Sequence, residues 1–202
     1  MAHAARSRKG DAKAQGRSRS QLTARMQSSR PRIASAVLVP IYRGEDAELR
    51  LVLIRRSERG VHGGHLAFPG GKRDPEDASL QETALREAWE ELGLDRQLVE
   101  VLTELPTVET MTTDFLIYPF LARIVRPNTW NPSEREVAEV VEVKLADLAR
   151  LEARGEDITR LSTWIAPQRG PFYRVGHYQV LGATYRILHP LLPRLLGGEW
   201  EF

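Results

Sequence analysis

The arrangement of apolar and polar residues divides the chain from residue 32 onwards into expected strands and helices. Residues 33–42 and 49–55 are rich in leucine and β-branched side chains, which is typical of strands. Residues 44–48 (GEDAE) lie between them and have the composition of a turn, so we predict a β-hairpin. The same kind of pattern predicts further strands at 98–105, 115–125, 137–143 and 172–181.

Helical patterns occur in the other apolar segments. Ser79 is followed three residues later by Glu82, the spacing of a capping box, and Gly93 follows the apolar pattern, so we predict a helix from about residue 79 to Leu92. A short helix is predicted at 145–153, and a longer one at 183–196 before two glycines. Mixed strands and helices favour an α/β or α+β sandwich of one domain, 32–202, without deciding between parallel and antiparallel pairing.

The first 31 residues differ from the rest in charge. The segment 1–32 holds nine of the 29 Lys and Arg residues and one of the 27 Asp and Glu residues. It also has almost no large apolar side chain before Leu22, so we predict that 1–31 is a disordered tail. A polyanion-binding arm or an organelle transit peptide remains an alternative. The acidic balance of the remaining residues gives no reason to expect a specific nucleic-acid partner.

Composition excludes several classes of protein. There is no cysteine, so a disulfide scaffold, a thiolate metal site and a cysteine nucleophile are excluded. The longest apolar run, 33–42, has about ten residues, whereas a membrane helix needs roughly 20. Apolar residues make up 42% of the chain and charged residues 28%, which is ordinary for a globular protein. We therefore expect a cytoplasmic protein with no membrane partner.

Three glutamates gather within the sequence REAWEELGL, which runs from Arg86 to Leu94. Successive helical residues are rotated by about 100°, so Glu87, Glu90 and Glu91 fall within an arc of roughly 100°. Like charges at these spacings repel, and a hard cation such as Mg²⁺ or Mn²⁺ would offset the repulsion through oxygen ligands. Taken alone, the segment is better explained as a glutamate-rich surface helix.

The residues before this helix favour the metal site. Phe68-Pro-Gly-Gly71 can bring its backbone close to a ligand or metal, because glycine has no Cβ. A glycine pair and a helix with three carboxylates, about fifteen residues apart, resemble the signature of the Nudix hydrolases. In that signature Gly71 is the opening glycine, Asp77 stands where glutamate is usual, and 86–94 supplies the rest. Eight residues separate Asp77 from Arg86, where seven are usual.

Other segments resemble the coenzyme A pyrophosphatase branch of the family. They are TALRE at 83–87, LIRRS at 53–57 and the glycine-rich residues that follow, although Arg59 is out of register with the branch pattern. The resemblance implies an α/β/α sandwich with a mixed sheet. It also implies that CoA or acyl-CoA is cleaved to 3′,5′-ADP and 4′-phosphopantetheine. Another Nudix activity, on ADP-ribose, a dinucleotide or an oxidised nucleotide, and a non-catalytic nucleotide-binding module are the alternatives.

The resemblance also implies roles for individual residues. Glu87 and Glu91 are expected to bind Mg²⁺ or Mn²⁺, with Glu90 sharing a second ion and the carbonyl of Gly70 or Gly71 completing the set. Arg86 is expected to hold a carboxylate such as Glu90, and the general base is a helix glutamate, Glu136 or Glu139. The substrate, a small nucleotide, is expected to be bound by a further set: Arg55, Arg56, Arg59, Phe68 and Gly70. A homodimer is an alternative to a monomer.

Overall fold

The computed structural model describes residues 32–58, 64–110, 114–150, 153–159 and 168–202. All of these belong to one compact unit, Arg32–Phe202. The predicted tail, 1–31, and Arg59 lie outside the described residues.

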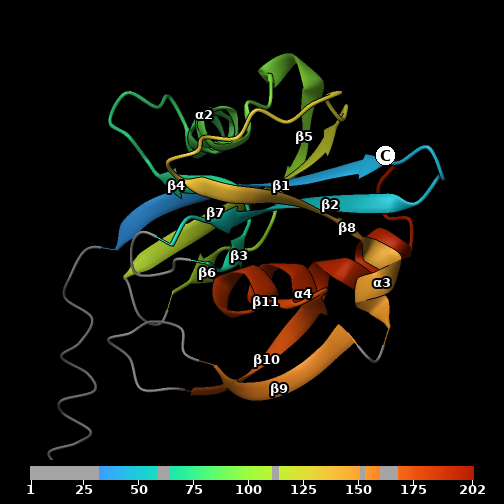
Figure 1. Ribbon diagram of the computed structural model, residues 1–202. Helices are drawn as coiled ribbons and strands as arrows, with labels where there is room; N and C mark the ends of the chain where they lie inside the picture. The colour runs from blue at the N-terminus through green and yellow to red at the C-terminus, as the bar shows by residue number, and fades with distance from the viewer. Residues whose placement is uncertain (1–31, 59–63, 111–113, 151–152, 160–167) are drawn as a thin grey trace, which may run out of the picture. The chain divides into compact units, whose positions relative to one another are not determined.

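A mixed sheet forms the centre of this unit (Figure 1). Its middle strands follow the order β3-β2-β1-β7-β5, with β4 paired to β1, β6 to β7 and β8 to β2. β1 and β7 run parallel, and the other pairs run antiparallel. The strands are β1 (Ile33–Arg43), β2 (Leu49–Arg56), β3 (Leu66–Ala67), β4 (Gly70–Lys72), β5 (Val99–Glu104), β6 (Val108–Glu109), β7 (Phe115–Ile124) and β8 (Val137–Lys144).

The remaining elements cover this sheet or extend from it. A second, antiparallel sheet has the order β11-β10-β9. The elements are the helices α2 (Leu80–Leu92), α3 (Leu145–Ala149) and α4 (Gly182–Leu196), the short 3₁₀ helix η1 (Arg96–Leu98), and the strands β9 (Arg154–Thr159), β10 (Gln168–Val175) and β11 (Tyr178–Val180). None of the helices in the described ranges is both long and apolar enough to cross a membrane.

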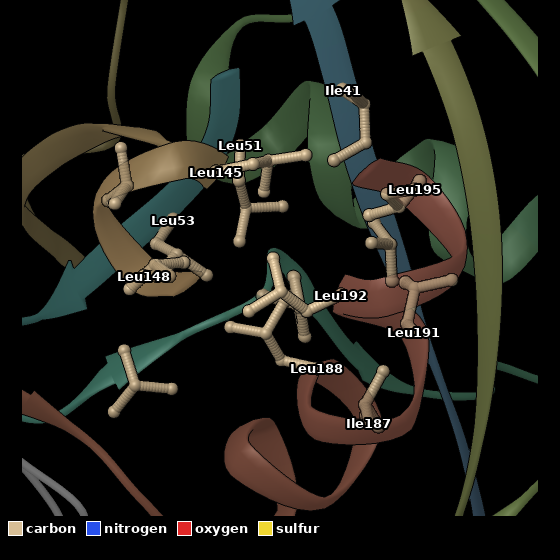
Figure 2. Packing of buried hydrophobic residues seen from close by; sticks show 14 of the residues in the cluster. Ile41, Leu51, Leu53, Leu145, Leu148, Ile187, Leu188, Leu191, Leu192 and Leu195 are labelled. Atoms are coloured by element: carbon tan, nitrogen blue, oxygen red, sulfur yellow. The ribbon is translucent and has the colours of Figure 1, made fainter. Parts of the chain in front are cut away.

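Alternating residues of β1 and β2 build two separate cores, because successive side chains of a strand point to opposite faces. On one face, Ala36, Leu38, Val52 and Ile54 pack with buried residues of α2 such as Leu92. The other face packs against α3 and α4, as the leucines labelled in Figure 2 show. The predicted sandwich of a sheet between helices is therefore confirmed.

Most predicted elements are confirmed, and two predictions need correction. Residues 172–181 were expected to form one strand, but Gly176, at φ +58°, allows a tight turn between β10 and β11, where Val175 pairs with Tyr178. The predicted helix 145–153 ends at Ala149, because the backbone of Arg150 is extended (ψ 146°). The hairpin of β1 and β2 and the helix α2 form as predicted.

Candidate metal and active site

The helix α2 begins and ends as its sequence predicts. The side chain of Ser79 accepts a hydrogen bond of 3.1 Å from the backbone N–H of Glu82, which satisfies a donor that the first helical turn leaves unpaired. At the other end Gly93 adopts a left-handed conformation, φ +66°, in which glycine is favoured. The apolar side of α2 packs on the sheet, and Glu87 and Glu91 are held beside β4.

Arg86 connects the helix to the loop before it. Its Nε and Nη2 donate to the two carboxylate oxygens of Asp77, at 2.9 and 3.0 Å. Its Nη1 donates to Glu87 and Glu90, both at 3.0 Å, and its Nη2 also donates to the carbonyl oxygen of Lys72 at 3.2 Å. Hydrogen bonding to this guanidinium holds the pKa of Asp77 well below its ordinary value. The expectation that Arg86 holds Glu90 agrees with this geometry.

Glu87 fills the space that Gly71 leaves open. A Cβ atom added to Gly71 would lie only 2.4–2.7 Å from the three atoms of the Glu87 carboxylate group. The side chain of Glu87 is 14% exposed, and burial raises the pKa of its carboxyl group. The carbonyl oxygen of Gly71 accepts a 2.7 Å hydrogen bond from the hydroxyl of Ser35. A glycine is thus required at this position for a carboxylate to approach the backbone of β4.

Glu91 is a buried ionisable group, with 1% of its surface exposed. Its Oε2 accepts a 2.8 Å hydrogen bond from the backbone N–H of Gly70, and its Oε1 lies 3.8 Å from Nη1 of Arg56. Burial is the main cause that raises the pKa of Glu91 to about 7. An isolated buried carboxylate is costly unless a cation or hydrogen-bond donors compensate it. The position of Glu91 therefore favours a site that receives a cation.

Glu90 has a different environment from its two neighbours. Its side chain is 51% exposed and its described partner is Arg86. Among the described residues no three acidic or histidine side chains form a ready-made metal centre. The oxygen donors of Glu87, Glu91 and β4 nevertheless suit Mg²⁺ or Mn²⁺ in kind, and the space beside Gly71 admits a carboxylate to the site.

The structure places Arg55 and Arg56 on opposite faces of the sheet. Arg56 lies on the α2 face, near Glu91. Arg55 lies on the other side, where its Nε donates to Glu139 at 3.4 Å and its guanidinium lies over the ring of Tyr178. The two residues are adjacent in a strand, so their side chains diverge. Only Arg56, of this pair, is close to the carboxylates of α2.

Glu136 and Glu139, the two loop acids predicted as alternative general bases, also differ in their surroundings. Glu136 lies close enough to Glu87 and Glu91 for its charge to contribute to their raised pKa values. Glu139 instead accepts hydrogen bonds from Arg55 and from the hydroxyl of Tyr178, the latter at 2.5 Å. Of the two, Glu136 is thus the acid whose charge acts on Glu87 and Glu91.

Phe68 and Gly70, the other residues predicted to bind substrate, both make contacts within the protein. Phe68 is 3% exposed and packs in the core beneath α3 and α4, so its ring is not available to a ligand in this structure. Gly70 contributes its backbone N–H to Glu91.

A cavity of about 230 Å³ lies elsewhere, and none of the acids discussed above lines it. Its wall consists of Arg43, Ala47, Glu48, Leu49, Leu145, Ala146, Leu195, Leu196, Gly198 and Trp200.

Ser57 is a residue near the site that the sequence analysis did not single out as functional. It follows β2 directly, and its hydroxyl donates to the carbonyl oxygen of Arg135 at 3.0 Å. Its backbone N–H donates to the carbonyl oxygen of Glu136 at 2.8 Å. Only the pairing of β2 with β8 reveals these contacts, because residues 57 and 136 are far apart in the chain.

Comparison with known proteins agrees with this geometry. Residues 32–164 match the family model described as NUDIX domain. A protein of Citrobacter koseri named Uncharacterized Nudix hydrolase NudL is 40% identical over 165 residues, which cover 78% of this chain and 80% of that protein. The protein of the same name from Enterobacter sp. is 37% identical over 162 residues, with the same coverage of each chain.

Solved structures show the same fold. A Nudix hydrolase from M. Smegmatis, RenU, is similar with a TM-score of 0.50 and 25% identity, over 58% of this chain and 74% of that one. A MutT/nudix family protein from Enterococcus faecalis is similar with a TM-score of 0.52 and 14% identity, over 92% of this chain and 71% of that one. With the signature on α2 and β4 and the match over residues 32–164, the chain belongs to the Nudix hydrolase family.

Proposed function

We propose that this Nudix pyrophosphohydrolase uses Mg²⁺ or Mn²⁺ to cleave the diphosphate bridge of CoA or acyl-CoA. The products would be 3′,5′-ADP and the 4′-phosphopantetheine that carries the acyl group. The observation that carries the proposal is the placement of Glu91, buried and bonded to Gly70, beside Glu87, which occupies the space opposite Gly71. A helix that merely displayed glutamates to solvent would have no reason to bury one of them.

The proposed metal ligands are the carboxylates of Glu87 and Glu91, with Glu90 for a second ion and the carbonyl oxygen of Gly71 as a backbone ligand. A bound divalent ion would neutralise charge on the diphosphate oxygens. Arg86 binds three of the acids at once and so sets the starting positions of Glu87 and Glu90. In this role it supports the ligands and does not contact substrate.

Glu136 is the proposed general base. It approaches the carboxylates from a different element than α2, and Glu139 is held on the opposite face by Arg55 and Tyr178. A base in this position would accept a proton from the attacking water. The electron pair of the water would form a new P–O bond as the bridging P–O bond breaks, and the departing phosphate would leave as the anion.

Arg56 is the proposed contact to the diphosphate, because it is the described arginine of β2 that faces the acids of α2. Arg55, on the other face, would reach only a part of the substrate remote from the bridge. The choice of CoA rests on the resemblance of residues 53–57 and 83–87 to the CoA pyrophosphatase branch. A second candidate, hydrolysis of another nucleoside diphosphate derivative, has the same support from the site itself.

The test is hydrolysis by the purified full-length chain with Mg²⁺ or Mn²⁺ and a panel of substrates. The panel contains CoA, acyl-CoA, ADP-ribose, a dinucleotide and an oxidised nucleotide, and products are identified by mass spectrometry. The highest kcat/KM is expected for CoA or an acyl-CoA. A higher kcat/KM for another compound of the panel would identify that compound as the substrate in place of CoA. Binding without cleavage at either ion would indicate a nucleotide-binding module.

A further inference from the structure

The segment that leads into β8 is attached at both ends to the candidate site. At one end the backbone N–H of Ser133 donates to the carbonyl oxygen of Glu91 at 3.2 Å. At the other end Ser57 donates twice, from its hydroxyl to Arg135 and from its backbone N–H to Glu136. The segment 133–136 therefore extends from the buried glutamate of α2 to the end of β2, and Glu136 is its last residue.

A change of register follows directly. Along most of the pair, β2 and β8 keep one antiparallel register, up to Arg55 opposite Glu139, but Arg56 lies opposite Val137. Ala138 is thus an extra residue, which is the arrangement of a β-bulge. Because of it, Val137 is buried in the core on the α2 face, whereas Glu139 remains with Arg55 on the other face.

The bulge sets the face of Val137, not that of Glu136. Without the extra residue, Val137 would share the face of Glu139, because a shift of one residue reverses every side chain. Glu136 lies in the turn that precedes β8, so its position depends on how that turn is held. Within the turn, the backbone N–H groups of Glu136 and Val137 donate to the carbonyl oxygen of Ser133, at 3.0 and 2.8 Å. From outside the turn, Ser57 adds its two hydrogen bonds, to the carbonyl oxygens of Arg135 and Glu136.

We propose that Ser57 is a positioning residue, which holds Glu136 towards Glu87 and Glu91 through its bonds to the carbonyl oxygens of Arg135 and Glu136. This inference rests on the proposed function, because Glu136 needs a fixed position only if it acts on the reaction. Ser57 itself touches no reacting atom. The hydroxyl is the component that a substitution can remove, since the backbone N–H is retained in any residue except proline.

The experiment is a double-mutant cycle on the full chain with Ser57→Ala, Glu136→Gln and the two combined, measured with the preferred substrate and Mg²⁺. Ser57→Ala is expected to lower kcat about 3- to 10-fold, the equivalent of one neutral hydrogen bond, and to change KM by less than about 2-fold. Ser57→Thr, which keeps a hydroxyl, should restore kcat to within about 2-fold. In the Glu136→Gln background, Ser57→Ala should have no further effect.

A matched control distinguishes a specific role of Ser57 from the general effect of removing one side-chain hydrogen bond. Thr103 on β5 also donates its hydroxyl to a carbonyl oxygen, that of Glu104 at 3.1 Å, and Thr103→Val should leave kcat unchanged. If Ser57→Ala lowers kcat equally in the wild-type and Glu136→Gln backgrounds, or in neither, the proposed role of Ser57 is wrong. The proposed hydrolase activity would not be affected by that result. A wild-type chain that cleaves no diphosphate with either ion would instead refute the proposed function, and the positioning role with it.

Discussion

Nη1 of Arg56 lies 3.8 Å from the buried carboxylate of Glu91. The distance is longer than a hydrogen bond, so the guanidinium remains able to bind a second anion. We therefore expect Arg56→Ala to lower kcat/KM at least about 10-fold, since hydrogen bonds between charged groups contribute roughly 1.5–3 kcal/mol. The control is Arg50→Ala, on the same strand but paired with Asp46 at the hairpin. Steady-state kinetics decide the matter, and equal effects of the two substitutions would contradict the assignment.

Gly71→Ala should damage the site without unfolding the protein. The new Cβ would displace the carboxylate of Glu87, which is the end of a flexible side chain, so the affinity for Mn²⁺ should decrease, as measured by electron paramagnetic resonance. Gly70→Ala is the contrasting variant, because its Cβ would lie 2.3 Å from the carbonyl oxygen of Ala36. The backbone must then move, and the melting temperature should fall. An unchanged Mn²⁺ affinity in Gly71→Ala would count against Glu87 as a ligand.

The sequence was informative wherever local chemistry decides the structure. Ser79 and Gly93 delimit α2 because a side-chain oxygen and a left-handed glycine satisfy the unpaired groups at helix ends. The spacing of Glu87 and Glu91 likewise follows from helical geometry alone. These features depend on residues fewer than five positions apart, or on one glycine, and they can be recognised without knowledge of the tertiary fold.

Features that depend on residues far apart in the chain could not be predicted from the sequence. The division of Arg55 and Arg56 between two faces follows from the pairing of β2, and the partner of Arg55, Tyr178, comes from a different sheet. The bulge at Ala138 depends on the register between two strands about 80 residues apart. Burial of Phe68 results from packing against α3 and α4. Its position beside a glycine pair suggested a ligand contact because sequence alone does not show which side the core occupies.

Asp77 should be essential for stability as well as for the site. It is 8% exposed, and its carboxylate accepts hydrogen bonds from Arg86 and from the hydroxyl of Thr83, the latter at 2.8 Å. Asp77→Asn would replace the carboxylate that accepts two hydrogen bonds from the guanidinium of Arg86 with a neutral amide, and we expect the free energy of unfolding to fall by about 2 kcal/mol. Chemical denaturation measures this loss. Asp74→Asn is the control, since Asp74 is 3.7 Å from Arg86 and mostly exposed, and it should have little effect.

Stability without metal should depend on pH through Glu91. Its pKa is about 7 in the folded protein, against an ordinary value of 4.5, so between these values the folded state retains a proton that the unfolded state has released. The free energy of unfolding should therefore decrease as the pH rises from about 4.5 to about 7, by on the order of 3 kcal/mol. Glu91→Gln has no proton to lose and should show a flatter profile, whereas Glu90→Gln, at a mostly exposed position, should retain the wild-type slope. Urea unfolding in EDTA between pH 4 and 8 measures these slopes, and a Glu91→Gln profile as steep as the wild-type one would show that folding does not raise the pKa of Glu91.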